Sequence, residues 1–479
     1  MPLAPSKSAA KKISVPENYA VLFGLFLGLA IWKFGNPVIL ERILLPPKSW
    51  HDAWLDAWPI AWANAALLAI GIAGVLLLFI NRLRWRANRW LWILPLVWLA
   101  WQFLSATRSP YHDLTSPTLW QYAGCVTCYF LGAFVFGPLA RRRLLFIGVL
   151  AAFAFCLIRA VDQKLFEFPT ERQLLVESQR AGWTNMPPSL FLELKQENII
   201  INTNGIDVAN PAILAKYEKG RVSGTLVYPN ALAGLVLLLL PVALALIWMI
   251  TRKLRSLVCI AAMGLTLFLG LGGLFWSGSK SGWLLALAIG VLSLLRLKWP
   301  RQLKWLVVIL IVGGGLTLFG LRFQNYFAKG ATSVSARLDY WRAATRTTID
   351  HPALGTGPGS FQRPYSELKR PESEMARLVH NDYLEQFSDS GLVGGITYLA
   401  WVGFLLWTLS RLVWKSIDWV DFTIFAGLLG WFLQGFIEFG LFIPALAWTA
   451  FTLAGCLLTT NPTVAHSIRN QFDKPQPPV

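Results

Sequence analysis

The sequence predicts an all-α membrane protein, a polytopic helix bundle of about twelve transmembrane helices with two long loops on its outer face. Hydrophobic residues make up 55% of the chain, including 24 Trp and 30 Phe, which is more apolar surface than a soluble domain can bury. Twelve apolar runs approach the roughly 20 residues that cross about 30 Å of hydrocarbon. They lie at 18–35, 60–80, 90–106, 118–138, 144–160, 226–250, 256–276, 281–295, 305–322, 392–410, 421–437 and 439–459.

Basic residues alternate along the connections between these runs. Lys and Arg cluster after every second run, at 81–89, 140–143, 251–255, 296–304 and 411–415, and also at 6–12. Because basic loops stay on the cytoplasmic side, both termini are expected to be cytoplasmic and the other connections to face outward. The formal net charge of +18 is therefore interpreted as a topology signal and as attraction to anionic lipid, and no nucleic-acid partner is expected.

Two outward connections are too long to be turns, and loops of this length usually carry function. They divide the chain into five segments. The first loop mixes acidic and basic residues nearly evenly and is expected to form a small ordered subdomain or lid. The segments are 1–160 with the first five membrane helices, 161–224 as the first outer loop, 225–322 with four more helices, 323–391 as the second outer loop, and 392–479 with the last three helices and a cytoplasmic tail.

The second outer loop contains a predicted amphipathic helix. The segment SVSARLDYWRAATRTTIDHP places Leu338, Trp341 and Ile349 on one helical face before a proline stop. Such a helix is expected to lie along the membrane surface. Arg337 stands in its first half, next to the apolar face.

The same loop ends in LVHNDYLEQFSDSGLVGG, which holds one of five histidines in the chain. His380 and Asn381 are expected at the first turn of a helix whose apolar face includes Tyr383. Gly391 is expected to cap its C-terminus, because glycine adopts the left-handed conformation that ends helices.

The connection between the seventh and eighth runs, SGSKSG, is short and polar. The eighth run has fifteen residues, about 22 Å of helix, so Lys280 is expected at a helix N-terminus at the edge of the apolar layer. The helix dipole and desolvation disfavour a cation there unless an anion joins it. Free N–H groups, serine hydroxyls and an ammonium together predict a phosphate site, and a lysine that snorkels to the surface is the alternative.

Arg221, Lys280, Arg337, His380 and Glu438 are all expected on the outer face. Three cations and an imidazole predict a site for a diphosphate headgroup, with a lipid pyrophosphate as the ligand. For Arg221 the alternative is a charge at a membrane boundary. Glu438, in the tight turn between the last two runs, is expected either to bind the acceptor or to stabilise that turn.

Metal and cofactor chemistry has no support in the sequence. The chain contains no P-loop, no H-E-x-x-H and no nucleotide fingerprint. Cys125 and Cys128 form a C-x-x-C inside an apolar run, with no His or third Cys nearby, and are interpreted as core residues. We therefore expect neither a metal nor a cofactor.

The region from about 220 to 460 resembles the O-antigen ligase and O-antigen polymerase family of bacterial inner-membrane glycosyltransferases. The resemblance is carried by SGSKSGWLLALAIG, by SARLDYWRAATRTTIDHPALGTGPGSFQ and by HNDYLEQFSDSGLVGG. The last fits the family pattern of His, then Asn, Ser or Gln, nine residues, Gly, two residues and Gly, at His380, Asn381, Gly391 and Gly394. The resemblance implies a C-type glycosyltransferase fold with a periplasmic lid.

The resemblance also implies the reaction. A glycan is transferred from undecaprenyl pyrophosphate to a glycan or lipid-core hydroxyl, without a metal and with inversion at the anomeric carbon, in lipopolysaccharide or exopolysaccharide synthesis alongside other assembly proteins. His380 matches the catalytic histidine and Arg337 a diphosphate-binding arginine, whereas Lys280 stands where the family more often has an arginine and lacks its bidentate fork. The residues expected to bind substrate are Arg221, Asn381, Tyr383 and Glu438.

Physical chemistry favours the same roles. Cations that stabilise the charge on the departing pyrophosphate supply much of such a catalysis, and a neutral His380 is suited to accept the proton of the incoming hydroxyl. Asp382 and Glu385 either orient the imidazole or form the solvated face of a polar helix, and the pattern favours the solvated face.

Several functions remain open. A ligase, a polymerase and a protein-glycosylating enzyme share this motif, and the rival from another class is a solute transporter or a flippase-like binding protein. A transporter is expected to carry charges at mid-membrane in broken helices. Here the charges gather in the outer loops, which favours an enzyme.

Overall fold

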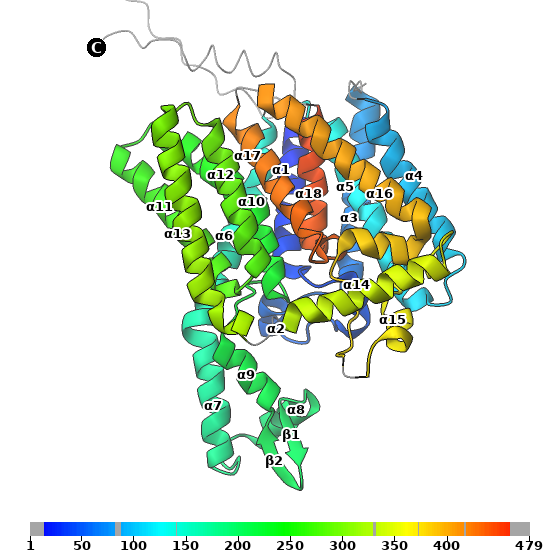
Figure 1. Cartoon of the computed structure of the whole chain (residues 1–479), viewed down its shortest axis with the longest axis vertical. Coiled ribbons are helices and arrows are strands. Elements are labelled where there is room, and N and C mark those ends of the chain that lie inside the picture. Colours follow the sequence, from blue (N-terminus) through cyan, green and yellow to red (C-terminus); the bar gives the residue numbers. More distant parts are fainter. Residues whose placement is uncertain are drawn as a thin grey trace, which may run out of the picture.

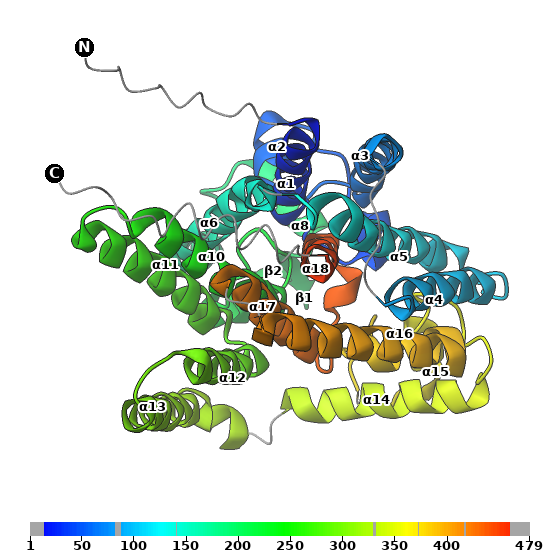
Figure 2. The same ribbon diagram turned by 90° about the horizontal axis from the view of Figure 1, so that it is seen from above.

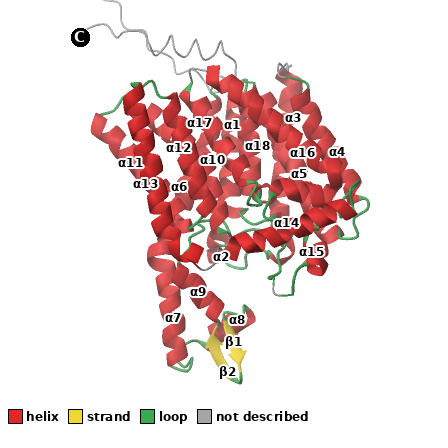
Figure 3. Cartoon of the chain, in the orientation of Figure 1, coloured by secondary structure: helices red, strands yellow, loops and turns green. Residues whose placement is uncertain are grey.

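The computed structural model describes residues 14–81, 88–139, 141–328, 332–371, 373–415 and 418–459. The basic segment 6–12 and the tail after 459 lie outside these residues. The described chain is almost entirely helical, with one two-stranded sheet (Figure 3). The predicted all-α membrane bundle is therefore confirmed.

Every apolar run of the sequence coincides with a helix of the bundle. The bundle helices are α1 (Val15–Lys33), α3 (Ile60–Asn81), α4 (Trp90–Ala106), α5 (His112–Leu131, continued by a π-helical turn at Gly132–Phe136), α6 (Phe146–Asp162), α10 (Pro229–Thr251), α11 (Ser256–Ser277), α12 (Lys280–Arg296), α13 (Arg301–Ala328), α16 (Asp382–Lys415), α17 (Trp419–Gln434) and α18 (Pro444–Leu458). Among the described residues, eight helical segments are long and apolar enough to cross a membrane. The remaining bundle helices, α4, α12, α17 and α18, are shorter.

The bundle has a buried centre and an apolar periphery. Every residue of α18 is buried, and Figure 2 shows this helix in the middle, with α1, α5, α16 and α17 around it. At the periphery, α13 leaves side chains such as Ile309, Leu310 and Leu318 exposed. Because exposing apolar side chains to water is unfavourable, this periphery is suited to contact lipid tails.

The close contact of α1 with α6 depends on two glycines one turn apart. A Cβ at Gly24 would lie 2.1 Å from the Leu145 carbonyl oxygen, and one at Gly28 would lie 2.5 Å from that of Gly148. The backbones touch because neither glycine has a side chain, which is the small-xxx-small packing of membrane helices.

The first outer loop begins as a continuation of α6. A π-helical segment (Gln163–Glu167) leads into α7 (Phe168–Arg180), followed by α8 (Pro188–Gln196), β1 (Ile200–Thr203), β2 (Ile206–Ala209) and α9 (Pro211–Lys219). The two strands pair antiparallel, with Ile200 opposite Ala209. This α7–α9 subdomain projects from the lower end of the bundle in Figure 1.

The second outer loop lies across the same end of the bundle (Figure 1). It contains α14 (Thr332–Asp350), which confirms the predicted helix, and α15 (Gln362–Leu368). The face of α14 that packs against the protein carries Tyr340, Ala343 and Ala344, whereas Leu338 and Ile349 of the predicted apolar face are 57% and 64% exposed. Short elements complete the chain: the 3-10 helices Val38–Ile43, Arg142–Leu145 and Gly440–Phe442, and α2 (Trp50–Leu55).

A kink divides α16 into a short N-terminal part and a longer C-terminal part. Ser390 and Gly391 leave helical geometry, and Gly391 adopts φ 70° and ψ −171°. A Cβ there would lie 2.3 Å from the Ala353 carbonyl oxygen. The expected break at Gly391 is thus present, and its backbone conformation is one that only glycine adopts readily.

The first prediction concerns this kink. Gly391→Ala is expected to destabilise the protein by about 1–3 kcal/mol, because alanine is strained at this φ and collides with the α14–α15 loop. Thermal unfolding in detergent measures the effect. The matched control is Gly403→Ala in the same helix, where an added Cβ meets nothing within 4 Å. Equal melting temperatures for both variants would contradict the prediction.

Candidate active site

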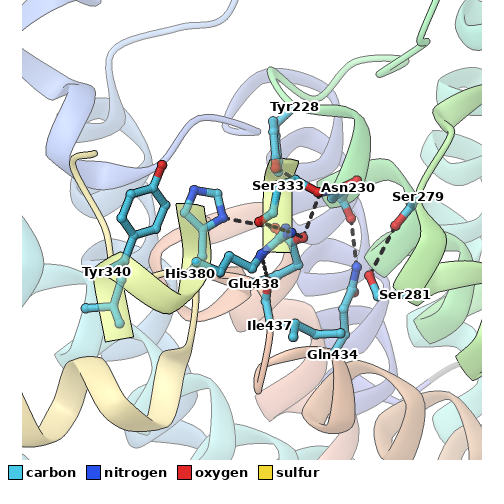
Figure 4. A network of polar contacts seen from close by, with 12 residues as sticks. Tyr228, Asn230, Ser279, Ser281, Ser333, Tyr340, His380, Gln434, Ile437 and Glu438 are labelled. Atoms are coloured by element: carbon cyan, nitrogen blue, oxygen red, sulfur yellow. Dashed lines mark hydrogen bonds and ion pairs between the residues drawn. The ribbon is translucent and has the colours of Figure 1, made fainter. Parts of the chain in front are cut away.

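The site is built around the Glu438 carboxylate, in the turn between α17 and the 3-10 helix that precedes α18. Glu438 is only 5% exposed. Its Oε1 accepts a hydrogen bond of 2.6 Å from Arg337 Nη2 on α14. It also accepts one of 2.6 Å from Asn230 Nδ2 on α10 (Figure 4). Its Oε2 lies 3.5 Å from His380 Nδ1. One buried carboxylate therefore connects three segments that are far apart in the sequence.

The Arg337 guanidinium group donates three hydrogen bonds. Besides its bond to Glu438, Nε donates to the Ile437 carbonyl at 3.2 Å and Nη1 to the Ser333 carbonyl at 3.4 Å. The guanidinium thus ties α14 to the turn that carries Glu438. Because its donors have a rigid planar arrangement, these contacts orient the cation as well as anchor it.

Arg221 reaches the same network from the end of the first outer loop. Its Nε donates to the Ser277 carbonyl at 2.7 Å, at the C-terminus of α11, and Nη2 donates to Asn230 Oδ1 at 2.9 Å. Burial lowers the pKa of Arg221 from its ordinary value, while Tyr228 and Glu438 oppose this shift. Asn230 therefore links the two arginines, one through its oxygen and the other through Glu438.

Lys280 stands at the first position of α12, as the sequence predicted. The Ser279 side chain caps this helix by accepting from Gly282 N at 3.2 Å. The Lys280 ammonium lies 3.8 Å from the centre of the Tyr326 ring, a cation–π contact with α13. The Tyr326 hydroxyl in turn is 2.6 Å from that of Ser333, whose carbonyl binds Arg337. Lys280 thus borders the network without a direct bond to it, within electrostatic reach of both arginines.

The imidazole of His380 is framed by aromatic rings. Tyr340 stacks on it at a centroid distance of 5.8 Å and Tyr228 lies at 6.2 Å (Figure 4). The Phe439 ring packs edge-on at 4.8 Å. His380 has φ +55°, an uncommon left-handed conformation for a residue other than glycine. Asn381 then caps α16, because its Oδ1 accepts from the backbone N–H groups of Tyr383 and Leu384.

Three further residues of this helix lie behind the site. The Tyr383 ring is buried, and its hydroxyl donates to the Phe432 carbonyl at 2.8 Å. Asp382 and Glu385 are 3% and 0% exposed, so the favoured interpretation of a solvated helix face was wrong. The Asp382 carboxylate accepts from Leu441 N at 3.1 Å, and Glu385 accepts from Val379 N at 3.2 Å. Asp382 thereby binds the turn that carries Glu438 to the start of α16.

Sequence reasoning missed several members of the site. They are Tyr228, Asn230, Tyr340, Gln434 and Phe439. Asn230 carried a signal, since it is an amide in the first turn of an otherwise apolar helix and needs a partner there. The aromatic residues carried none, because aromatic side chains are abundant throughout the chain.

The charges of the site favour an anionic ligand. Arg221, Lys280 and Arg337 bring three positive charges, and Glu438 one negative charge, to the end of the bundle that α14 covers. The described residues contain no group of three or more His, Cys, Asp or Glu side chains placed to hold a metal ion. Cys125 and Cys128 are buried within the bundle core.

Comparison with known proteins relates one part of the chain to a known family. Residues 265–399 match the family model described as O-antigen ligase. This range contains Lys280, Arg337 and His380, whereas Arg221, Asn230 and Glu438 lie outside it, so it is narrower than the range of about 220 to 460 that the motifs suggested. No curated protein matches the chain.

The second prediction concerns the docking of α14. Glu438→Gln is expected to increase amide hydrogen exchange in residues 332–350 about tenfold or more, because the half-buried Arg337 loses its counter-charge. The matched control is Asp350→Asn, which removes the exposed ion pair of Arg346 with Asp350 on the same helix (2.9 Å). Exposed pairs contribute little, so exchange in the control is expected to change by less than about threefold. Similar exchange in both variants would show that Glu438 does not anchor α14.

Proposed function

We propose that this chain, whose residues 265–399 match the family model described as O-antigen ligase, transfers a glycan from a polyprenyl-pyrophosphate carrier to a sugar hydroxyl. The family places the protein among membrane enzymes of polysaccharide assembly. The proposal also names the carrier, the acceptor and the location. The donor is carried on undecaprenyl pyrophosphate, the acceptor is a sugar hydroxyl, and the protein lies in the bacterial inner membrane with its site facing the periplasm.

The observation that carries the proposal is the meeting of two arginines and a histidine at one buried carboxylate. Arg337 and His380 approach opposite oxygens of Glu438, and Arg221 joins them through Asn230. With Lys280 beside them, the cations exceed the carboxylate by two charges. This excess matches the two negative charges of a diphosphate diester, and charge-assisted bonds from arginine suit its oxygens.

In the proposed reaction the acceptor hydroxyl attacks the anomeric carbon of the donor sugar. Its oxygen forms the new glycosidic bond, the bond from that carbon to the phosphate oxygen breaks, and the electron pair leaves with the lipid pyrophosphate. The cations stabilise the charge that develops on this leaving group. Attack from the face opposite the pyrophosphate inverts the anomeric configuration, and the route uses protein cations where other enzymes use a metal ion.

His380 is the proposed general base. Its Nδ1 points toward Glu438 Oε2, at a distance of 3.5 Å that is longer than a hydrogen bond. Catalytic contacts of this kind often tighten when substrate binds. A proton on Nδ1, held by Glu438, leaves Nε2 free to accept the proton of the acceptor hydroxyl. Glu438 would then fix the tautomer of the base and also position Arg337.

The position of the site favours an enzyme over a transporter. The charged network is formed by residues at the first turns of α10 and α12, on α14 and in the turn after α17. Figure 1 shows α14 across one end of the bundle and not along its middle. Transporters of the inverted-repeat type hold their ligand near the bilayer midplane between broken helices.

The experiment that tests the function compares lipid-linked glycans from cells that lack the protein with those from cells that carry it, sized on a gel. Single repeat units that accumulate on the carrier would identify a polymerase. Long chains that stay on the carrier would identify a ligase. Unchanged glycans would refute the proposal.

The third prediction is that His380→Ala abolishes transfer, because the acceptor hydroxyl loses its base. Loss of a positioned general base typically lowers the rate about 10²- to 10⁴-fold. The glycan gel and the amount of protein in the membrane fraction are the two measurements. His351→Ala is the matched control, since His351 is exposed beyond the end of α14. Normal transfer by the His380 variant, at normal protein levels, would disprove the assignment.

The fourth prediction concerns the charge of Lys280. Lys280→Gln is expected to lower transfer about 10²-fold, because a cation at the leaving group is lost, and Lys280→Arg is expected to stay within about tenfold of the wild type. Initial rates with purified donor measure both. The control Lys298→Gln removes an exposed cation between α12 and α13 and is expected to be silent. A fully active Lys280→Gln variant would remove Lys280 from the site.

A further inference from the structure

A groove between α7 and α9 lies outside the site. It has a volume of about 660 Å³ and is lined by residues that include Lys164, Arg172, Glu177, Arg180, Tyr217 and Glu218. Ligand sites commonly enclose about 300–1,000 Å³. The groove is therefore large enough to hold a ligand, and nothing in the proposed chemistry uses it.

The lining combines planar polar groups with an aromatic ring. Arg172 and Arg180 lie eight residues apart on α7, about two helical turns, and both line the groove from the α7 side. Both are exposed, and within the described residues neither forms an ion pair or a hydrogen bond with another side chain. Tyr217 presents a half-buried ring whose inner side packs on Phe168 at 5.8 Å. Two unused guanidinium groups beside a fixed ring suit a hydroxyl-rich ligand.

The groove adjoins the site along the chain. Gly220 lines its inner end and directly precedes Arg221, which bonds to Asn230 in the site. Lys164, from the π-helical segment that follows α6, donates to the Gly220 carbonyl at 3.3 Å and holds α9 against this segment. From there the α7–α9 subdomain extends away from the bundle, beyond α14 (Figure 1). A chain that reacts at His380 and runs outward would follow this groove.

We propose that the groove between α7 and α9 is a glycan-binding subsite, which holds sugars several units away from the reacting sugar. This inference rests on the proposed function and names the ligand class that the α7–α9 subdomain selects. Three cations and two carboxylates line the groove, so its charge is mixed. Such a lining favours neutral or weakly acidic sugars over a polyanion, and its polarity disfavours a lipid tail.

The test measures glycan binding directly, with the full chain in nanodiscs. The probe is the cell-surface polysaccharide of the source strain, cut to oligosaccharides and labelled at one end with a fluorophore, and fluorescence anisotropy gives Kd. Arg172→Gln combined with Arg180→Gln is expected to weaken binding about tenfold or more, since two hydrogen bonds to charged donors are lost. Because both side chains are exposed, the substitutions are expected to leave the fold intact. The matched control is Lys216→Gln with Lys219→Gln, on α9 but outside the groove.

Two outcomes would overturn the subsite. One is an unchanged Kd in the Arg172 and Arg180 variant. The other is a Kd that the two substitutions change only in nanodiscs containing phosphatidylglycerol and not in nanodiscs of pure phosphatidylcholine, which would assign the arginines to lipid headgroups. The proposed function is tested separately, because His380→Ala is expected to bind the oligosaccharides normally and to transfer none. Normal transfer by that variant would refute the function without changing the binding result.

Discussion

The buried carboxylate of Glu438 is the constraint on which the end of the bundle next to α14 depends. A carboxylate removed from water is costly unless cations and hydrogen-bond donors surround it. Here the donors come from α10 and α14, and the histidine before α16 approaches its second oxygen. The need to satisfy one charge therefore determines where α14 docks and which residues face each other. A diphosphate would meet an Arg337 that is already oriented by its contacts with Glu438 and two backbone carbonyls.

The lengths of two bundle helices, α17 and α18, position the site. α17 and α18 are among the shorter helices, and the turn between them carries Glu438 into the bundle. Asp382 fastens this turn to α16, since its carboxylate accepts from Leu441 and its N–H donates to the Gly435 carbonyl at 2.7 Å. The kink at Gly391 separates the N-terminal part of α16, which directly follows His380, from the C-terminal part that continues through the bundle. Rigid elements thus hold His380 and Glu438 in place, as the proposed catalysis requires.

The two long loops differ in how they contact the bundle. The α14 loop packs on the bundle through its small side chains and contributes Arg337 to the site. The α7–α9 subdomain is an extension of α6, meets the site only near Gly220 and Arg221, and carries a polar groove along its side. In the proposed function, the α14 loop completes the reaction centre, and in the further proposal the α7–α9 subdomain binds the sugar chain that enters it.

The sequence alone determined the features that depend on local pattern. Hydropathy located the membrane helices, the SGSKSG turn placed Lys280 at a helix start, and the spacing of His380 and Gly391 defined a short helix with a break. Only the tertiary structure decided which polar residues are buried together. Asp382 and Glu385 look like a solvated face in the sequence, because nothing local shows that Asp382 binds the turn after α17 or that Glu385 is buried. Asn230, Tyr340 and Glu438 join His380 from distant elements, and such contacts depend on packing between helices, which no local sequence pattern records.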